Sequence, residues 1–224
     1  MCKYLGFTEG IHYISNVDLI LESSVYTIII LSLFERMIMD SVTHAQSIVG
    51  TGKARIKNDF YPTPTEATVA LLEKWYFDVE KPVWECACGD GAISKVLESR
   101  GYKVLSTDKN DYGYGIPGVN FLESSRFSDT IITNPPFKLA EEFVYHAHEI
   151  GITKLAMFLK LAFLEGQARK IMYAKYPPAK VFVFSKRVSF GVGNGKSKNN
   201  GMIAFAWFVW DVNFPAPKPI IEWI

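Results

Sequence analysis

The stretch PVWECACGDG, residues 82–91, decides the fold of this 224-residue chain. Its first half is a short apolar run typical of a buried strand, and its second half contains a Gly-x-Gly turn. Residues 92–100 follow with apolar side chains at helical spacing, and Gly101 is a suitable stop. A strand, a glycine turn and a helix in this order predict the first unit of a parallel α/β sheet.

The same alternation continues to residue 211. A loop rich in Gly, Asn and Lys, residues 191–201, precedes the longest strand signal, residues 202–210. Alternating strands and helices that end in two strands joined by a loop predict an α/β fold, with a mostly parallel sheet and an antiparallel final hairpin. The other expected strands are residues 103–107, 119–122, 130–133, 155–159 and 180–184, and the other expected helices are residues 138–150 and 166–176.

Composition divides the chain into three segments and limits its class. We expect an N-terminal extension and basic linker at residues 1–57, the α/β domain at residues 58–212, and an extended Pro-rich tail at residues 213–224. With 49% hydrophobic residues, 21% charged residues and a net charge of +1, the chain is an ordinary globular one. The apolar run at residues 25–34 is shorter than the roughly 20 residues that cross a bilayer.

The cysteines and histidines indicate neither disulfides nor a metal site. Cys2, Cys86 and Cys88 are odd in number and lack the spacing of a metal-ligand set, so the sequence favours a reducing, cytoplasmic environment. His146 and His148 are two apart, so they point in different directions on a helix. We therefore expect no bound metal.

Asn134-Pro135-Pro136-Phe137 follows a predicted buried strand. Prolines cannot continue a central strand, so the strand must end there. The residues leave an amide, main-chain carbonyls and an aromatic ring at its carboxyl end. This set can hold a planar ring that carries an amino group, although a rigid turn would explain the prolines equally well.

Residues 60–66, FYPTPTE, predict the start of a helix. Thr63 is expected as the N-cap, Pro64 at the first helical position, and Glu66 completes a capping box. Tyr61 and the second proline exceed what a cap requires.

The glycine turn has the features of a nucleoside site. Gly89 and Gly91 let a ligand approach the main chain closely, and Glu85 lies next to the turn. Asp108 follows Gly91 by seventeen residues, near the roughly 20-residue spacing at which an acid reaches ribose hydroxyls. The third glycine of the dinucleotide fingerprint is missing, so a nucleoside with a charged amino-acid end fits better than NAD.

These motifs together resemble the amino-methyltransferases that use S-adenosylmethionine, and most of all the phage or prophage N6-adenine DNA methyltransferases. The resemblance rests on ECACGDG (residues 85–91), Asp108 and NPPF (residues 134–137). YPTP (residues 61–64) is similar to the cofactor-contacting segment of the family members with this motif order. The likeness covers residues 59–211, and Cys86 stands where many members have proline.

The resemblance implies a Rossmann-like class I methyltransferase sheet with helices on both faces, and a catalytic domain at residues 58–212. It implies S-adenosylmethionine as the cofactor. Glu85 would engage its amino-acid end, Asp108 its ribose, Asn120 and Phe121 would flank its adenine, and Tyr61 and Thr63 would close the methionine side. The full implied cofactor set is Tyr61, Thr63, Pro64, Glu85, Cys86, Ala87, Gly89, Gly91, Asp108, Asn120 and Phe121.

The resemblance also implies the catalytic set Asn134, Pro135, Pro136 and Phe137. The Asn134 side-chain oxygen and the Pro135 carbonyl would accept the hydrogens of the adenine amine. Phe137 would stack on the base once it is flipped out of the duplex. No side chain needs to remove a proton before the amine attacks, which suits a motif without His, Lys or Cys.

Basic residues favour a nucleic acid as the substrate, which the resemblance implies is DNA, with RNA possible. Eight Lys or Arg residues and no Asp or Glu lie between residues 166 and 210. We expect the loop at residues 191–201 to contact the DNA backbone, and the extension at residues 1–57 to be a candidate for homo-oligomer formation. The expected nucleic-acid contacts are Lys186, Arg187, Lys196 and Lys198.

Three alternatives stay open. The Asn-Pro-Pro-Phe motif also resembles RNA methyltransferases that act on guanine N2 or adenine N6. Enzymes that methylate a glutamine amide in a protein are more distant, because they usually carry tyrosine at the fourth position. A cofactor-binding partner subunit without activity is the third alternative.

Overall fold

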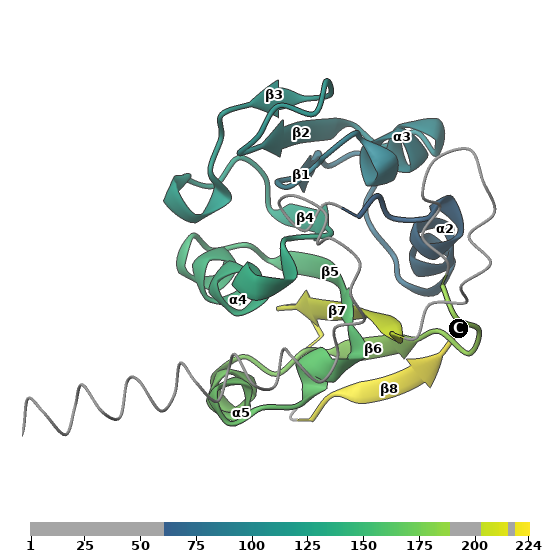
Figure 1. Ribbon diagram of the computed structural model, residues 1–224, viewed down its shortest axis with the longest axis vertical. Coiled ribbons are helices and arrows are strands. Elements are labelled where there is room, and N and C mark those ends of the chain that lie inside the picture. Colours follow the sequence, from purple (N-terminus) through teal and green to yellow (C-terminus); the bar gives the residue numbers. More distant parts are fainter. Residues whose placement is uncertain (1–60, 189–202, 215–217) are drawn as a thin grey trace, which may run out of the picture. The chain divides into compact units, whose positions relative to one another are not determined.

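The computed structural model describes residues 61–188, 203–214 and 218–224. These residues build one eight-stranded sheet, which Figure 1 shows nearly edge-on. In spatial order its strands are β3 (Ile116–Pro117), β2 (Val104–Asp108), β1 (Val83–Glu85), β4 (Thr130–Thr133), β5 (Lys154–Lys160), β7 (Phe205–Asp211), β6 (Lys180–Val183) and β8 (Ile220–Trp223).

The strand directions confirm the predicted sheet. Strands β3, β2, β1, β4 and β5 are parallel neighbours. Strand β7 is antiparallel to both β5 and β6, and it lies between them. The strands from β3 to β5 thus form the parallel part of the sheet, and β7 runs antiparallel to its two neighbours.

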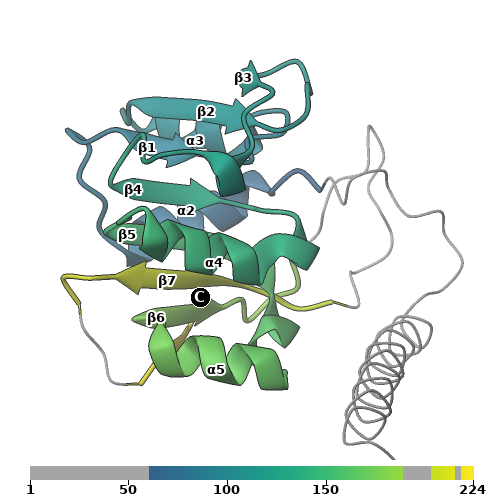
Figure 2. The same cartoon turned by 90° about the vertical axis from the view of Figure 1, so that its left-hand side faces the viewer.

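Helices cover both faces of the sheet, as the resemblance implied. Figures 1 and 2 show α2 (Thr65–Lys74) and α3 (Ala92–Ser99) on one face. Helices α4 (Ala140–Glu149) and α5 (Gln167–Lys175) lie on the other. None of the described helices has the length and apolar run that a bilayer crossing requires.

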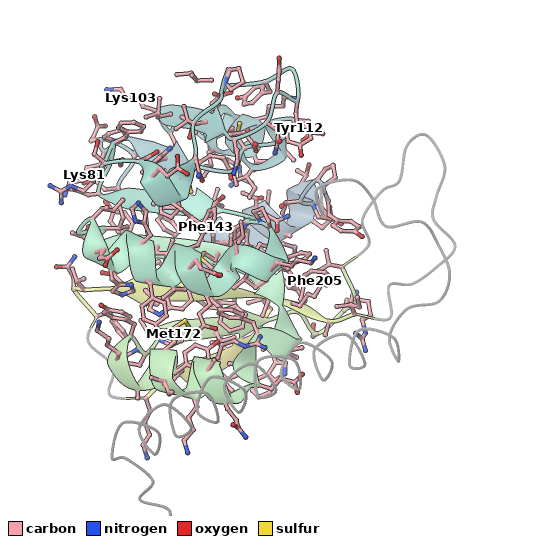
Figure 3. All side chains as sticks on the ribbon, turned by 60° about the vertical axis from the view of Figure 1, so that its left-hand side comes forward. Lys81, Lys103, Tyr112, Phe143, Met172 and Phe205 are labelled. Atoms are coloured by element: carbon pink, nitrogen blue, oxygen red, sulfur yellow. The ribbon has the colours of Figure 1, made fainter. Side chains whose placement is uncertain are left out.

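The central strands are apolar on both sides because each face packs against helices. In β5, Met157 belongs to the hydrophobic cluster under α4 and α5, while its neighbour Phe158 belongs to the cluster under α2 and α3. Figure 3 labels Phe143 on α4 and Met172 on α5, two buried side chains of the first cluster. Alternation along the strands thus divides one sheet between two cores.

The expected strand at residues 119–122 is wrong. Its residues enter a 3₁₀ helix, η2 (Phe121–Glu123), and the third strand in sequence is β3 instead. The Asn120 side chain accepts a hydrogen bond from the Leu122 main-chain N–H and donates one to Glu123. An Asn that caps the following turn competes with strand pairing, which explains the difference.

The expected capping box is also wrong. Helix α2 starts at Thr65, Pro64 occupies the N-cap position, and no side chain caps the helix. Thr63 lies one residue too early, and its hydroxyl accepts a hydrogen bond from Asn134 instead. A residue assigned to local capping therefore makes a contact 71 residues along the chain.

The end of the tail joins the sheet. Strand β8 pairs in parallel with β6, and Glu222 on β8 forms ion pairs with Lys74 and Lys180. The expected extension and linker at residues 1–57, the boundary at 57/58, and the basic loop with Lys196 and Lys198 lie outside the described residues.

Gly115 offers a test of how closely the loop after β2 packs. A Cβ at Gly115 would lie 2.7 Å from the Ser106 carbonyl oxygen, whereas a Cβ at Gly113 would meet nothing within 4 Å. Both residues have positive φ, 67° and 77°, so Ala is strained at each by roughly 1–2 kcal/mol. Denaturant unfolding should show Gly115→Ala to be less stable than Gly113→Ala by a further ~1–3 kcal/mol. Equal losses would contradict the close contact.

Candidate active site

The carboxyl ends of β1, β2 and β4 surround a pocket of about 760 Å³, part of which is open to solvent. β1 and β4 are the neighbours at which a doubly wound sheet reverses its strand order, where such sheets bind ligands. The predicted site residues that line it are Tyr61, Thr63, Glu85, Cys86, Ala87, Gly89, Asp108, Asn120, Phe121, Asn134 and Pro136.

The Asp108 side chain, at the end of β2, holds the glycine turn in place. Its Oδ2 accepts a hydrogen bond from the Gly89 main-chain N–H at 2.9 Å, and its Oδ1 accepts one from Asn110 at 2.8 Å. The side chain is buried. Each carboxylate oxygen can accept more than one hydrogen bond, so Asp108 can hold the turn and still receive a ligand hydroxyl.

Glu85 is buried in the pocket wall, and neither carboxylate oxygen has a hydrogen-bond partner among the described residues. Burial raises the pKa of Glu85 well above its ordinary value, and the negative charge of Asp108 adds to the shift. The neighbouring Thr133 hydroxyl and Asn134 main-chain N–H oppose the shift, although neither has the geometry of a hydrogen bond to the carboxylate. Buried acceptors without partners are costly, so this position suits a ligand that donates hydrogen bonds.

The pocket lining is acidic. Among the described residues that line it, Glu85, Asp90 and Asp108 are acidic and Lys109 is basic. Burial, together with the charges of Glu85 and Asp108, raises the pKa of the Cys88 thiol to about 12. Such a thiol is protonated at neutral pH and is a poor nucleophile. The pocket therefore favours a positively charged ligand over a diphosphate.

Asn134 lies at the pocket mouth with a fixed side chain. Its Nδ2 donates hydrogen bonds to the Tyr61 main-chain oxygen and to Thr63 Oγ1, both at 2.9 Å. No described group donates to its Oδ1 or to the Pro135 carbonyl. The Asn134 oxygen is thus left as an acceptor at the end of β4, and the Pro135 carbonyl follows it in a residue that is itself buried.

Phe137 belongs to a small aromatic group beside the pocket. Its ring lies 6.2 Å from that of Tyr61 in a stacked arrangement and 5.7 Å from that of Phe205. Lys160 Nζ lies 4.7 Å from the Phe137 ring centroid. A half-buried aromatic ring with a cation nearby suits a nucleobase and its phosphate.

The remaining predicted residues that the structure describes do not line the pocket. Pro64 precedes α2, and Gly91 is the left-handed residue before α3. Phe121 lines the pocket, but its ring is buried and packs against Trp84 and Phe143. Pro135 and Phe137 do not line the pocket, and Lys186 and Arg187 are exposed after β6.

Several lining residues were not predicted. Lys109 and Asn110 directly follow Asp108 at a strand end, and that position alone could have indicated them. Tyr112, labelled in Figure 3, lies farther along the same loop. Phe143 reaches the pocket from α4, and no local sequence pattern predicts this contact. The unpredicted residues of the lining are Pro62, Cys88, Asp90, Ala92, Ile93, Lys109, Asn110, Tyr112, Val119, Leu139 and Phe143.

Solved structures share this fold at low sequence identity. A type I restriction-modification methyltransferase subunit of Streptococcus thermophilus matches 73% of this chain with a TM-score of 0.53 and 11% identity; the chain spans 47% of that subunit. A Pyrococcus horikoshii protein provisionally assigned as an RNA methyltransferase has a TM-score of 0.53 and 15% identity, over 72% of this chain and 91% of that one.

The 23S rRNA methyltransferase ErmE has a TM-score of 0.50 and 13% identity, over 73% of this chain and 72% of that one. No protein-family model matches the sequence, and no curated protein matches it either. The chain has the class I methyltransferase fold that the sequence predicted.

The Glu85→Gln variant should be more stable than the wild type above pH 4.5, and the difference should grow as the pH rises. Because the pKa of Glu85 is raised in the folded state, the folded protein holds this proton more tightly than the unfolded chain does. Below the ordinary carboxyl pKa of 4.5 the two proteins should be equally stable. Above it the wild type loses stability until Glu85 ionises in the folded state, and the Gln variant does not.

Urea unfolding at several pH values measures this difference. Glu73→Gln, which removes a carboxylate exposed on α2, is the matched control and should follow the wild type. A Glu85→Gln stability curve parallel to that of the wild type at every pH would contradict the argument.

Proposed function

We propose that this protein transfers a methyl group from S-adenosylmethionine to the exocyclic N6 amine of adenine in DNA. The observation that carries the proposal is the Asn134 side chain, whose nitrogen is held by Tyr61 and Thr63 so that its Oδ1 is left as an acceptor in the wall of an acidic pocket. An amine has two hydrogens to donate and a lone pair to direct. The fold and the pocket meet the other requirement of the reaction, a site for the methyl donor.

The pocket fits the proposed cofactor. S-adenosylmethionine supplies a methyl group on a positively charged sulfur, attached to a nucleoside and an amino acid. Glu85 would accept hydrogen bonds from its ammonium group, because its buried oxygens have no other partner. Asp108 would receive ribose hydroxyls, Asn120 and Phe121 would form the wall at its adenine, and Tyr61 would close the methionine side.

Asn134 and Pro135 would prepare the substrate amine for attack. The lone pair of an adenine amine is delocalised into the ring, which makes it a weak nucleophile. Two acceptors that hold both hydrogens would favour a pyramidal nitrogen, with its lone pair directed at the methyl carbon. The bound cofactor would supply the methyl group: the nitrogen–carbon bond would form as the carbon–sulfur bond breaks with its electrons on sulfur, and the nitrogen would release a proton to water.

Phe137 would hold the base. A base inside a duplex cannot reach the end of β4, so it must be flipped out of the stack. Stacking on an aromatic side chain contributes roughly 1–3 kcal/mol. Phe137 lies two residues beyond the Pro135 carbonyl, so the ring and the acceptors would engage the same base.

A nucleic acid is the substrate that the surface favours. Lys160 lies beside Phe137, and Lys186 and Arg187 are exposed after β6. The solved structures of similar fold include methyltransferases of restriction-modification systems and of 23S rRNA, which supports a polynucleotide. We propose residues 58–212 as the catalytic domain, and residues 1–57 as a segment for assembly.

A transfer assay with labelled S-adenosylmethionine tests the proposed function. Unmethylated duplex DNA, RNA and a protein mixture are offered in parallel, and label should enter DNA. Asn134→Ala should lower the transfer rate by roughly 10²–10³-fold, by analogy with the loss of one transition-state hydrogen bond. It should keep the affinity for the cofactor. Asn213→Ala, at an exposed position after β7, is the control.

Label in RNA or protein with none in DNA would contradict the DNA proposal. Unchanged turnover of Asn134→Ala would remove Asn134 from the role assigned to it.

Lys186→Gln combined with Arg187→Gln should weaken DNA binding at every sequence. Each cation removed from a phosphate lowers the slope of log affinity against log salt by about 0.9, so the slope should fall by roughly two. The control pair is Lys81→Gln with Lys103→Gln. Figure 3 shows both lysines, which precede β1 and β2 at the opposite ends of the strands from the pocket. Equal slopes for the two double variants, by fluorescence anisotropy, would place the DNA elsewhere.

A further inference from the structure

Thr63 and Asn134 meet although 71 residues separate them in the sequence. Thr63 is 5% exposed and precedes α2, while Asn134 ends β4. The Asn134 Nδ2 lies 2.9 Å from Thr63 Oγ1 and 2.9 Å from the Tyr61 main-chain oxygen. The two hydrogens of this amide nitrogen therefore have two acceptors, both supplied by the segment before α2.

The Tyr61 carbonyl decides which way the carboxamide points. A main-chain carbonyl can only accept hydrogen bonds, so the nitrogen of Asn134 must face it and the oxygen must face away. The Thr63 hydroxyl then accepts the remaining N–H and fixes the plane of the amide. No N–H of Asn134 is left to point toward the substrate.

We propose that Thr63 is a positioning residue for methyl transfer, which acts by fixing the Asn134 carboxamide so that only its oxygen meets the substrate. This inference rests on the proposed function. It assigns Thr63 a role in the chemical step, beyond its place in the cofactor pocket wall.

The fixed amide would also select the substrate group. An amide free to turn can offer either an oxygen to an amine or an N–H to a carbonyl. Held by Tyr61 and Thr63, Asn134 offers an oxygen alone, so a base that carries a carbonyl at this position would place two acceptors against each other. Adenine presents an amine there and hypoxanthine, otherwise the same ring, presents a carbonyl. The amide oriented by Tyr61 and fixed by Thr63 thus favours amino-bearing bases over their keto counterparts.

Thr63→Val tests this role because valine keeps the shape of threonine and removes the hydroxyl. On plasmid DNA that the wild type methylates, kcat should fall about tenfold, the effect of one uncharged hydrogen bond left unmade. The Kd of S-adenosylmethionine should stay within about threefold of the wild-type value. Thr63→Ser should restore kcat, and Thr65→Val, at the exposed first residue of α2, should leave it unchanged.

The outcomes separate this inference from the proposed function. If the wild type transfers no methyl group to any polymer, the proposed function fails. If the wild type is active and Thr63→Val keeps its kcat, or loses cofactor affinity instead, the positioning role fails and the proposed function stands.

A second measurement does not depend on the variant folding. In the wild type, both side-chain amide hydrogens of Asn134 should exchange with water slowly, as followed by nuclear magnetic resonance. Rapid exchange of either one would overturn the proposed hold on the amide.

Discussion

The contact between the Asn134 carboxamide and the segment Tyr61–Thr63 joins the two halves of the site. The segment before α2 forms one wall of the pocket, and Asn134 lines the pocket from the end of β4. Neither piece can be placed by its own local structure, because both are irregular main chain next to prolines. Their mutual hydrogen bonds fix one against the other, and the proposed chemistry needs that fixed geometry.

The sheet makes this contact possible. Parallel pairing brings the carboxyl ends of β1, β2 and β4 to one edge, and so gathers Glu85, Asp108 and Asn134 from distant parts of the sequence. Asp108 holds the glycine turn through the Gly89 N–H, and Glu85 is buried without a partner. A buried carboxyl without a partner destabilises the free protein, and the ammonium group of the cofactor that we propose would supply the missing hydrogen bonds.

Residue patterns predicted the alternation of strands and helices, the antiparallel final hairpin and the lining of the pocket at Gly89, Asp108 and Asn134, because strand ends and glycine turns are local features. They misplaced Thr63 and Asn120. Thr63 has the spacing of a helix cap, yet its hydroxyl accepts a hydrogen bond from Asn134, far along the chain. A rule based on neighbouring residues cannot include such a long-range contact. Asn120 caps a turn in a stretch whose apolar neighbours had indicated a strand. Phe143 reaches the pocket only through the packing of α4.

The most direct test of the central claim is the identity of the methylated nucleoside. Duplex DNA is incubated with the protein and S-adenosylmethionine, digested to nucleosides and analysed by mass spectrometry. The account predicts N6-methyldeoxyadenosine as the product, because two oxygen acceptors at Asn134 and Pro135 select an exocyclic amine. A methyl group on a ring carbon or a ring nitrogen would contradict it.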